Sequence, residues 1–305
     1  MSKRVYVVLG MIATLIGCHI PAADAYTGAF LSHPRQAAPV SLRGLNVIVA
    51  NKSWNGFGTR TCLTVHDAHN VYIHDVDFNG CGGDIFLVNV TGMIRIENVR
   101  ARNTGDGTAG AGHGNVIQFN NVWQSAPELP GGGARIRAIK AYGGHTEDVI
   151  SVYKSGGFDA RHPLVIGDVH VEHPLSGPLA WSSRSGTCVN LADHGGHDIR
   201  LQYSTFLNCG AVGIQMNEPG HNVKVRNNIV YGQRRLISNV GLSQWSSGTC
   251  SSRCPGNEYR GNKVWWVKAN AVPSPMWLSG RFPVADLSNY KQISTINVTT
   301  LRVRF

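Results

Sequence analysis

The sequence repeats two kinds of short segment along most of its length, and this repetition restricts the fold more than any other feature. Segments of the first kind alternate in character and begin at Leu63, Ile85, Val116, Val149, Val189, Ile214 and Leu242. Segments of the second kind place Asn or Asp two residues after an apolar one; examples begin at Val49, Ile73, Ile96, Ile166 and Val225. Successive first segments begin 22 to 40 residues apart. A base period of 22–25 residues, lengthened by insertions, is typical of one coil of a parallel β-solenoid.

Period-two alternation predicts that the first and third residues of each segment point inward. Stacked coils would pair their backbones about 4.8 Å apart and hide the strand edges everywhere except at the two ends. No 3.6-residue periodicity persists, and the Asn-Gly or Asp-Gly pairs that hairpins favour are scarce between the segments. We therefore expect an all-β fold, a parallel β-helix of about seven to eight coils.

Asn and Asp recur at two fixed places in the repeat and predict two polar ladders inside the helix. The first place follows the first segment and holds Asn89, Asn120 and Asp193. The second place lies within the second segment and holds Asn51, Asp75, Asn98, Asp168 and Asn262. Amides and carboxylates stacked in this way bond the turn backbone and one another, so we interpret most of these residues as structural.

The N-terminus carries the features of a signal peptide. Lys3 and Arg4 precede an apolar run over residues 5–16, which is too short to span a bilayer, and no other stretch approaches that length. Two cleavage sites remain open. The signal peptide is either residues 1–25, ending in an Ala-x-Ala site, or residues 1–17, in which case Cys18 would carry a lipid anchor. We expect export to the periplasm, to the outer membrane as a lipoprotein, or to the medium. The remainder, 26–305, is expected to be one domain with coils over 42–267 and a cap or tail over 268–305.

Seven cysteines become six once Cys18 is set aside, an even number that suits disulfides in an oxidising compartment. The repeat suggests the pairs Cys62–Cys81 and Cys188–Cys209, and Cys250 with Cys254 would close a small loop. No pair has the C-x-x-C spacing of a zinc site.

The formal net charge of +10 predicts an anionic partner. The basic residues are scattered, apart from Arg234 and Arg235, which argues against nucleic acid. An acidic polysaccharide is therefore the expected partner of a monomeric chain. The alternative is that the charge only keeps the protein soluble.

Over residues 42–267 the chain resembles the pectate-lyase-like superfamily of right-handed parallel β-helices. The resemblance implies a right-handed helix and carbohydrate chemistry, usually on uronate-rich chains bound along an outer groove. It does not separate lyases from hydrolases, esterases, epimerases or non-catalytic adhesins. The segment Glu-Asp-Val-Ile-Ser-Val-Tyr-Lys-Ser-Gly over 147–156 is similar to part of the polygalacturonase pattern. The Asn-Thr-Asp and Arg-Ile-Lys motifs of those hydrolases are missing, and Gly112-His113-Gly114 comes too early.

The longest insertions predict where a groove would lie, in loops 103–115, 124–134, 157–163 and 174–187. Beside them stands the densest set of chemically active side chains, namely His145, Glu147, Asp148, Lys154, Arg161, Arg184, Asp193 and His194. In the coil alignment Lys154 stacks over His194, so both would reach one sugar.

These residues suit β-elimination on a uronate, in which a cation neutralises the carboxylate and a base removes the neighbouring proton. We assign Lys154 or His194 as the base and Arg184 as the neutraliser, with Arg161 in reserve. The expected substrate-binding residues are His145, Glu147, Asp148, Arg161 and Asp193. Calcium is the one cofactor considered, on Glu147, Asp148 and Asp193.

Two alternatives remain open. Hydrolysis would need two of the three carboxylates of Glu147, Asp148 and Asp193 to face one glycosidic bond. A non-catalytic protein would instead hold an acidic exopolysaccharide by charge and by stacking on exposed tryptophans, for which the candidates are Trp181, Trp245, Trp265 and Trp266.

Overall fold

The computed structural model describes residues 33–105, 114–124, 134–173, 186–217, 219–235, 239–245, 255–268, 270–278 and 291–292. These residues form strands and turns, and no helix occurs among them. The strands are β1 (Val40–Asn55), β2 (Thr61–Asn79), β3 (Gly83–Thr104), β4 (Ile117–Trp123), β5 (Arg135–Gly144), β6 (Ile150–Tyr153), β7 (Leu164–Glu172), β8 (Thr187–Asp193), β9 (His197–Gln202), β10 (Thr205–Leu207), β11 (Val212–Met216), β12 (His221–Arg226), β13 (Ile229–Arg235), β14 (Val240–Gln244), β15 (Glu258–Arg260), β16 (Lys263–Lys268), β17 (Met276–Leu278) and β18 (Lys291–Gln292).

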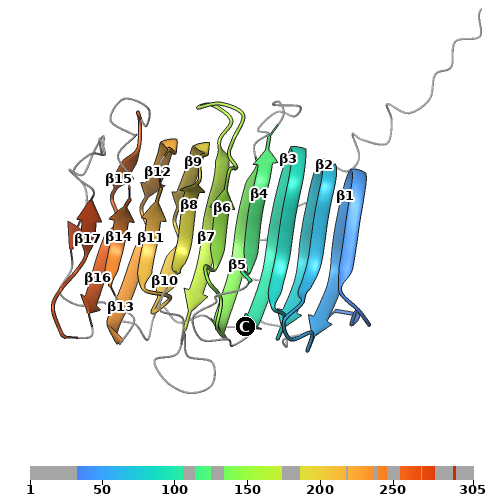
Figure 1. Ribbon diagram of the computed structural model, residues 1–305, viewed down its shortest axis with the longest axis horizontal. Helices are drawn as coiled ribbons and strands as arrows, with labels where there is room; N and C mark the ends of the chain where they lie inside the picture. Colours follow the sequence, from blue (N-terminus) through green and yellow to red (C-terminus); the bar gives the residue numbers. More distant parts are fainter. Residues whose placement is uncertain are drawn as a thin grey trace, which may run out of the picture.

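All pairings between these strands are parallel, and together they make one large curled sheet. The chain runs in successive circuits, each stacked on the one before, so that the strands line up in a row along the long axis (Figure 1). This arrangement is all-β and consistent with a parallel β-helix, as the repeat predicts.

Each circuit passes through three stacked columns of strands, which we call faces A, B and C. Face A contains β4, β6, β8, β11, β14 and β17, with the first parts of β2 and β3. Face B contains β9, β12 and β15, with the middle of β1–β3 and the first parts of β5 and β7. Face C contains β10, β13, β16 and β18, with the last parts of β1–β3, β5 and β7.

The core is built from columns of apolar side chains that lie on top of one another in successive circuits. On face B one such column holds Val71, Ile94, Leu164, Ile199 and Val223, all at most 1% exposed. Branched side chains suit this packing because they have few rotamers to lose and fit the pleated surface. The outward neighbours of these residues are polar or charged, which gives the alternation seen in the sequence.

The strand register differs from the prediction in two circuits. Ile85 pairs with Ile117, and Ile117 in turn pairs with Ile150, so these strands begin one residue later than the expected starts at Val116 and Val149. A one-residue shift exchanges the two sides of a strand. The inward residues are therefore Ile117 and Ile150. The apolar residue before each is also buried, in the turn, which is why the sequence pattern was ambiguous there.

The polar ladder after face A is real, but it lies on the outside. Asn89 belongs to it as predicted, whereas later positions fall one residue further on, at Asn121 rather than Asn120 and at His194 rather than Asp193. Asn89 donates a hydrogen bond to Asp67 at 3.0 Å, and Asn121 donates one to Asn89 at 2.8 Å. All three residues are exposed and have a left-handed backbone, with φ between 49° and 55°. Asn121, not Asn120, is the ladder residue, because this corner needs a residue that tolerates positive φ.

The ladder between faces B and C follows the prediction in part. Asn51, Asp75, Asn98 and Asp168 all have positive φ at this corner, and Asn98 donates to Asp75 at 3.1 Å. Asn262 does not belong to it. Its Oδ1 accepts the backbone N–H of Asn228, as the Asn228 Oδ1 accepts that of Ser204. This is a separate ladder inside the molecule, where buried amides satisfy corner N–H groups that would otherwise lack a partner.

Two of the predicted disulfides are confirmed. Cys62 bonds to Cys81 and Cys188 to Cys209, 19 and 21 residues apart, so each bridge closes one circuit. Such bridges point to folding in an oxidising environment. Cys18, Cys250 and Cys254 lie outside the described residues. No helix in the described part of the chain is long and apolar enough to cross a membrane.

Face C holds a buried ion pair. The Nε and one terminal nitrogen of Arg100 donate to the two carboxylate oxygens of Asp77 at 2.5 and 2.7 Å, and both side chains are at most 2% exposed. Removing one member of such a pair leaves an uncompensated charge in a site that water cannot reach.

We expect Arg100→Met to lower the free energy of unfolding by about 3–5 kcal/mol. The control is Arg137→Met, which removes a partly exposed arginine from its ion pair with Glu97 on face B and should cost less than about 1 kcal/mol. Urea denaturation of both variants measures the difference. Equal losses would contradict the interpretation of Arg100–Asp77 as the costlier pair to break.

Candidate functional site

The exposed ladder after face A changes its chemistry where it reaches Lys154. The register that stacks Asp67, Asn89 and Asn121 continues through Lys154 to the corner at His194, because Asn120 pairs with Tyr153 and Tyr153 with Asp193. Lys154 has φ 45° and His194 has φ 53°, so both keep the left-handed backbone of the ladder. The amide ladder is thus replaced by an amine and an imidazole over two circuits.

A lysine at this position has no local reason to be there. Asn and Asp adopt the left-handed region readily, whereas a lysine gains no hydrogen bond from it, and such backbone strain costs on the order of 1 kcal/mol or more. Strained residues of this kind concentrate where a side chain is needed for function.

Tyr153 lies between the two basic side chains. The Lys154 Nζ is 5.2 Å from the centre of the Tyr153 ring, and the His194 ring is 5.1 Å from it. The backbone N–H of Lys154 donates to the Asp193 carbonyl at 2.9 Å, which holds the two circuits together. Lys154 and His194 are therefore close neighbours, as the coil alignment predicts. We call Tyr153, Lys154 and His194 the Lys154 corner.

Three further rings line the turn that follows the Lys154 corner. The rings of Trp123 and His197 are 4.9 Å apart, and those of His197 and His221 are also 4.9 Å apart. Trp123 reaches His197 across an intervening circuit because Gly156, which pairs with it, has no side chain. Burial, and next the charge of His197, lower the pKa of His221.

This row of rings, formed by Trp123, His197 and His221, was not predicted from the sequence. Its members recur two or three residues after the ladder position. They could not be aligned with one another from the sequence, because the predicted register of the face A strands was wrong by one residue. The three rings lie on one another along the turn, so the faces of neighbouring rings are directed at each other.

Asp193 lies beside the Lys154 corner and is half-buried. Burial raises the pKa of its carboxyl, while the neighbouring His194 opposes the shift. The side chain is thus close enough to His194 to influence it electrostatically, in agreement with its predicted place beside the base.

Asp148 lies at the opposite end of the strand, in another internal ladder. Its Oδ1 accepts the backbone N–H and the hydroxyl of Thr187 at 2.7 and 2.9 Å, and its Oδ2 accepts Asn190 at 3.2 Å. Its own N–H donates to Asn115 Oδ1 at 2.9 Å. Burial, and next the charge of Glu147, raise its pKa to about 7, against the effect of these hydrogen bonds. Asp148 thus has a structural task, and its predicted contact with substrate stays a prediction.

The predicted site residues therefore fall into two groups. Glu147, exposed, and His145, partly exposed, precede face A together with Asp148. Lys154 follows face A, and six residues at about 3.3 Å each place it on the order of 20 Å from Asp148 along β6. A bound polymer would have to cross the whole strand to touch both groups.

Arg161 is exposed in the short loop 157–163, between faces A and B. Asp159 holds this loop by accepting the backbone N–H groups of Arg161 and His162, both at 2.8 Å. Arg200 on face B donates to the Ala160 carbonyl at 2.9 Å. Arg184 and most of the other predicted groove loops lie outside the described residues.

The expected calcium ligands do not come together. No group of three His, Cys, Asp or Glu side chains in the described ranges could hold a metal ion. Asp148 already accepts three hydrogen bonds, and Asp193 is at the other end of the strand from Glu147. These residues do not fit a shared calcium ion.

The expectation that Trp266 is exposed is wrong. It is 2% exposed and points into the core, because Trp265 and Trp266 alternate along β16. Trp245 is 48% exposed and Trp265 partly exposed, whereas Trp181 lies outside the described residues. Trp123, at the turn after face A, and Trp265, on face C, are both partly exposed.

Comparison with protein-family models, with curated proteins and with solved structures finds no match to this chain.

The raised pKa of Asp148 predicts a pH dependence of stability. The folded state binds this proton more tightly than the unfolded chain, in which the pKa of Asp is about 3.9. The resulting stabilisation is present near pH 4 and is lost as the pH rises to about 7. Asp148→Asn, which resembles the protonated side chain, should remove this component, so the stability of the wild type relative to the variant should fall between pH 4.5 and 7.5, at about 1.4 kcal/mol per pKa unit.

Urea denaturation at several pH values measures this difference. Asp159→Asn is the control, because burial, which raises the pKa of this carboxyl, is outweighed by the hydrogen bonds from His162 and Arg161, so that its pKa is lowered. A constant difference between wild type and Asp148→Asn across the pH range would contradict the prediction.

Proposed function

We propose that this protein cleaves an acidic, uronate-containing polysaccharide by β-elimination, with the Lys154 corner as the centre of the reaction. The observation that carries the proposal is the replacement of a regular amide ladder by Lys154 and His194, both in the left-handed conformation and both beside Tyr153. The amine, imidazole and phenol of the corner are groups capable of proton transfer.

In the proposed reaction, a cation first neutralises the carboxylate at C5 of the sugar, which makes the C5 proton more acidic. Lys154 or His194, in its neutral form, takes that proton. The electron pair forms the C4–C5 double bond, the bond from C4 to the glycosidic oxygen breaks, and Tyr153 can return a proton to the leaving oxygen. Arg184 remains the predicted neutraliser and Arg161 its reserve.

The geometry gives hydrolysis less support. A glycosidase needs two carboxyl groups about 5–9.5 Å apart across one bond. Asp148 is occupied by Thr187 and Asn190, and a strand separates it from Asp193. On the side of face A where Glu147 lies, the other candidate carboxylate is Asp148, and its oxygens are already engaged in these hydrogen bonds.

We further propose that the curled sheet is a right-handed β-helix of about seven to eight coils, similar to the pectate-lyase-like superfamily. Right-handed crossovers are the rule for parallel strands. The two disulfides support export, either as a lipoprotein anchored at Cys18 or after cleavage behind residue 25.

Lys154→Asn tests the reaction without disturbing the corner, because Asn is the residue that the ladder uses at Asn121. We expect an unchanged or higher melting temperature, since Asn tolerates positive φ, and a rate at least about 100-fold lower, since the amine is lost. The rate is measured on polygalacturonate and alginate, by the ultraviolet absorbance of the new C4–C5 double bond.

Lys263→Asn is the matched control, because Lys263 is an exposed lysine on face C. If His194 is the base, His194→Gln should lose most of the activity. Near-normal rates for both Lys154→Asn and His194→Gln would reject the Lys154 corner. New reducing ends without ultraviolet absorbance would indicate a hydrolase instead.

A further inference from the structure

Face B carries two outward columns of basic side chains. The first column runs through Tyr72, Arg95, Arg135, Val165, Arg200, Lys224 and Glu258 in successive circuits. The second runs through His74, Glu97, Arg137, Gly167, Gln202, Arg226 and Arg260. Arg135 and Arg260 are exposed, and the other cations of both columns are partly exposed.

The charge on this face is strongly unbalanced. Among the described residues the two columns hold seven lysines and arginines against two carboxylates, an excess of five positive charges. Glu97 pairs with Arg137 at 3.1 Å and Glu258 with Arg226 at 2.7 Å. Both carboxylates are thus engaged within the face. Arg135 lies between Arg95 and Val165 in its column, and Lys224 is next to Glu258, which pairs with Arg226.

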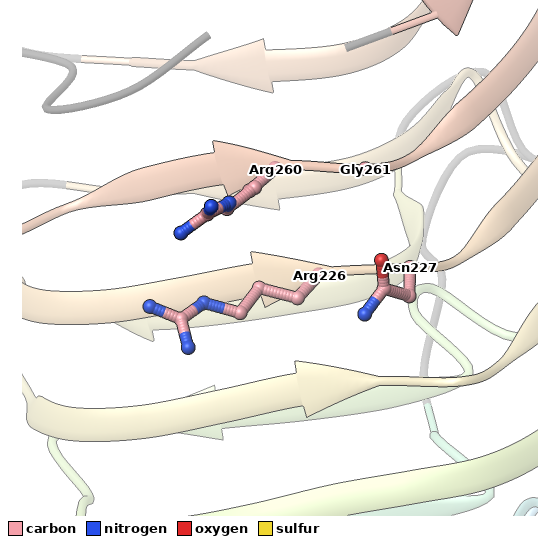
Figure 2. Close-up of a pocket in the computed structure, with 4 residues that line it drawn as sticks. All are labelled: Arg226, Asn227, Arg260 and Gly261. Carbon is pink, nitrogen blue, oxygen red and sulfur yellow. The ribbon is translucent and has the colours of Figure 1, made fainter. Parts of the chain in front are cut away.

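One end of face B is hollowed between two arginines. A depression of about 490 Å³ is lined by Arg226, Asn227, Arg260 and Gly261. Figure 2 shows the two arginine side chains extending in the same direction from neighbouring strands. Gly261 takes the ladder position at this corner with φ 65°, and a side chain there would collide with the Asn227 Oδ1. Arg226 is already bound by both oxygens of Glu258, so the exposed guanidinium of Arg260 is the group here that suits a further carboxylate.

An exposed aromatic residue borders the same face. Tyr203 occupies the left-handed corner position between Asp168 and Asn227, with φ 53°, and is 65% exposed. Its backbone N–H donates to the Arg226 carbonyl at 3.3 Å. The other members of this column are Asn, Asp, Ala138 and Gly261, all smaller than tyrosine, so here a ring is presented to solvent next to the basic columns.

We propose that face B binds a linear, carboxylated polysaccharide that lies along the stack of strands, with carboxylates on the basic columns and a sugar ring on Tyr203. Adjacent strands are about 4.8 Å apart, and an extended pyranose chain has a similar rise per sugar, so one carboxylate falls near each strand. The depression between Arg226 and Arg260 takes one of these carboxylates. Face B holds the polymer, and no bond is broken there.

Nucleic acid fits this face less well. A DNA duplex presents one charge per roughly 1.7 Å of its axis, far more densely than strands spaced about 4.8 Å apart present cations. A membrane surface would in turn be expected to engage apolar side chains at its interface. On face B the large apolar and aromatic side chains of these columns are confined to Ile48 and Tyr72 at one end and Tyr203 at the border, and most of the surface is basic. Charge spacing therefore favours a polyuronate.

The binding surface is separate from the Lys154 corner and does not depend on catalysis there. The test uses immobilised polygalacturonate and the full mature chain, with binding followed by biolayer interferometry. The triple variant Arg135→Gln, Arg200→Gln, Lys224→Gln should bind about tenfold more weakly or worse, and its slope of log affinity against log salt should fall by roughly 2, at about 0.7 for each lost contact. Its activity on short oligouronides should be unchanged.

The control triple Arg43→Gln, Arg60→Gln, Lys263→Gln removes the same charge from exposed positions away from face B, and it should bind within twofold of the wild type. A second triple variant, Arg135→Lys, Arg200→Lys, Lys224→Arg, keeps the three positive charges and should bind like the wild type. This result would show that the Gln variant loses binding through its lost charge and not through misfolding. Tyr203→Asn introduces the residue that the column uses at Asn227, so the corner should be kept while the ring is lost. We expect binding to weaken severalfold although the charge is unchanged.

Equal binding by the face B triple and the wild type would overturn the proposal, as would an equal loss in the control triple. Preference for duplex DNA or for phosphatidylglycerol vesicles over polygalacturonate would overturn it too, as would undiminished binding to methyl-esterified polymer. Absence of cleavage in every sample would reject the proposed lyase reaction while leaving these comparisons of affinity intact.

Discussion

The fixed register between successive circuits is the constraint on which the rest of the structure depends. Because each backbone pairs in parallel with the circuits before and after it, a residue's neighbours are set by its place in a circuit. The interior must then be filled by columns of similar side chains, as in the column from Val71 to Val223. The corners must accept the same backbone turn again and again, which explains why positive φ recurs at Asp67, Asn89 and Asn121.

Much of the fold could be predicted from the sequence because the repeat is written in local patterns. Strand alternation indicated parallel stacking, and the cysteine positions within the repeat indicated both disulfides that the described residues contain. The errors came where two adjacent residues satisfied the same pattern. Val116 and Ile117 are both buried, and Asn120 and Asn121 are both amides, so only the backbone geometry identifies which one faces inward or turns the corner.

The candidate site was predictable because its two basic residues hold the same place in the repeat. Lys154 and His194 each stand two residues after a first segment, so the alignment brought them together despite their separation in sequence. Face B was beyond the same reasoning, because its cations lie up to 40 residues apart, as Arg95 and Arg135 do, with insertions of different length between them. Each looks like an isolated surface charge until the register is known, and the scattered basic residues therefore gave no sign of one surface.

Exposed and buried columns carry different information in a fold of this kind. A buried position must match its neighbours in volume and hydrogen bonding, so a change there is constrained by packing, as for Asn228 and Asn262. An exposed corner position needs only to tolerate positive φ, which Asn, Asp and Gly do at least cost. A long or aromatic side chain at such a corner gains nothing from the backbone that it strains. Lys154 and Tyr203 are exceptions of this kind, and each borders a surface with its own chemistry: proton-transfer groups beside Lys154, and basic columns beside Tyr203. The proposed reaction and the proposed binding surface each start from one of these departures, since residues whose backbone strain is not offset by packing are best explained by what they meet outside the fold.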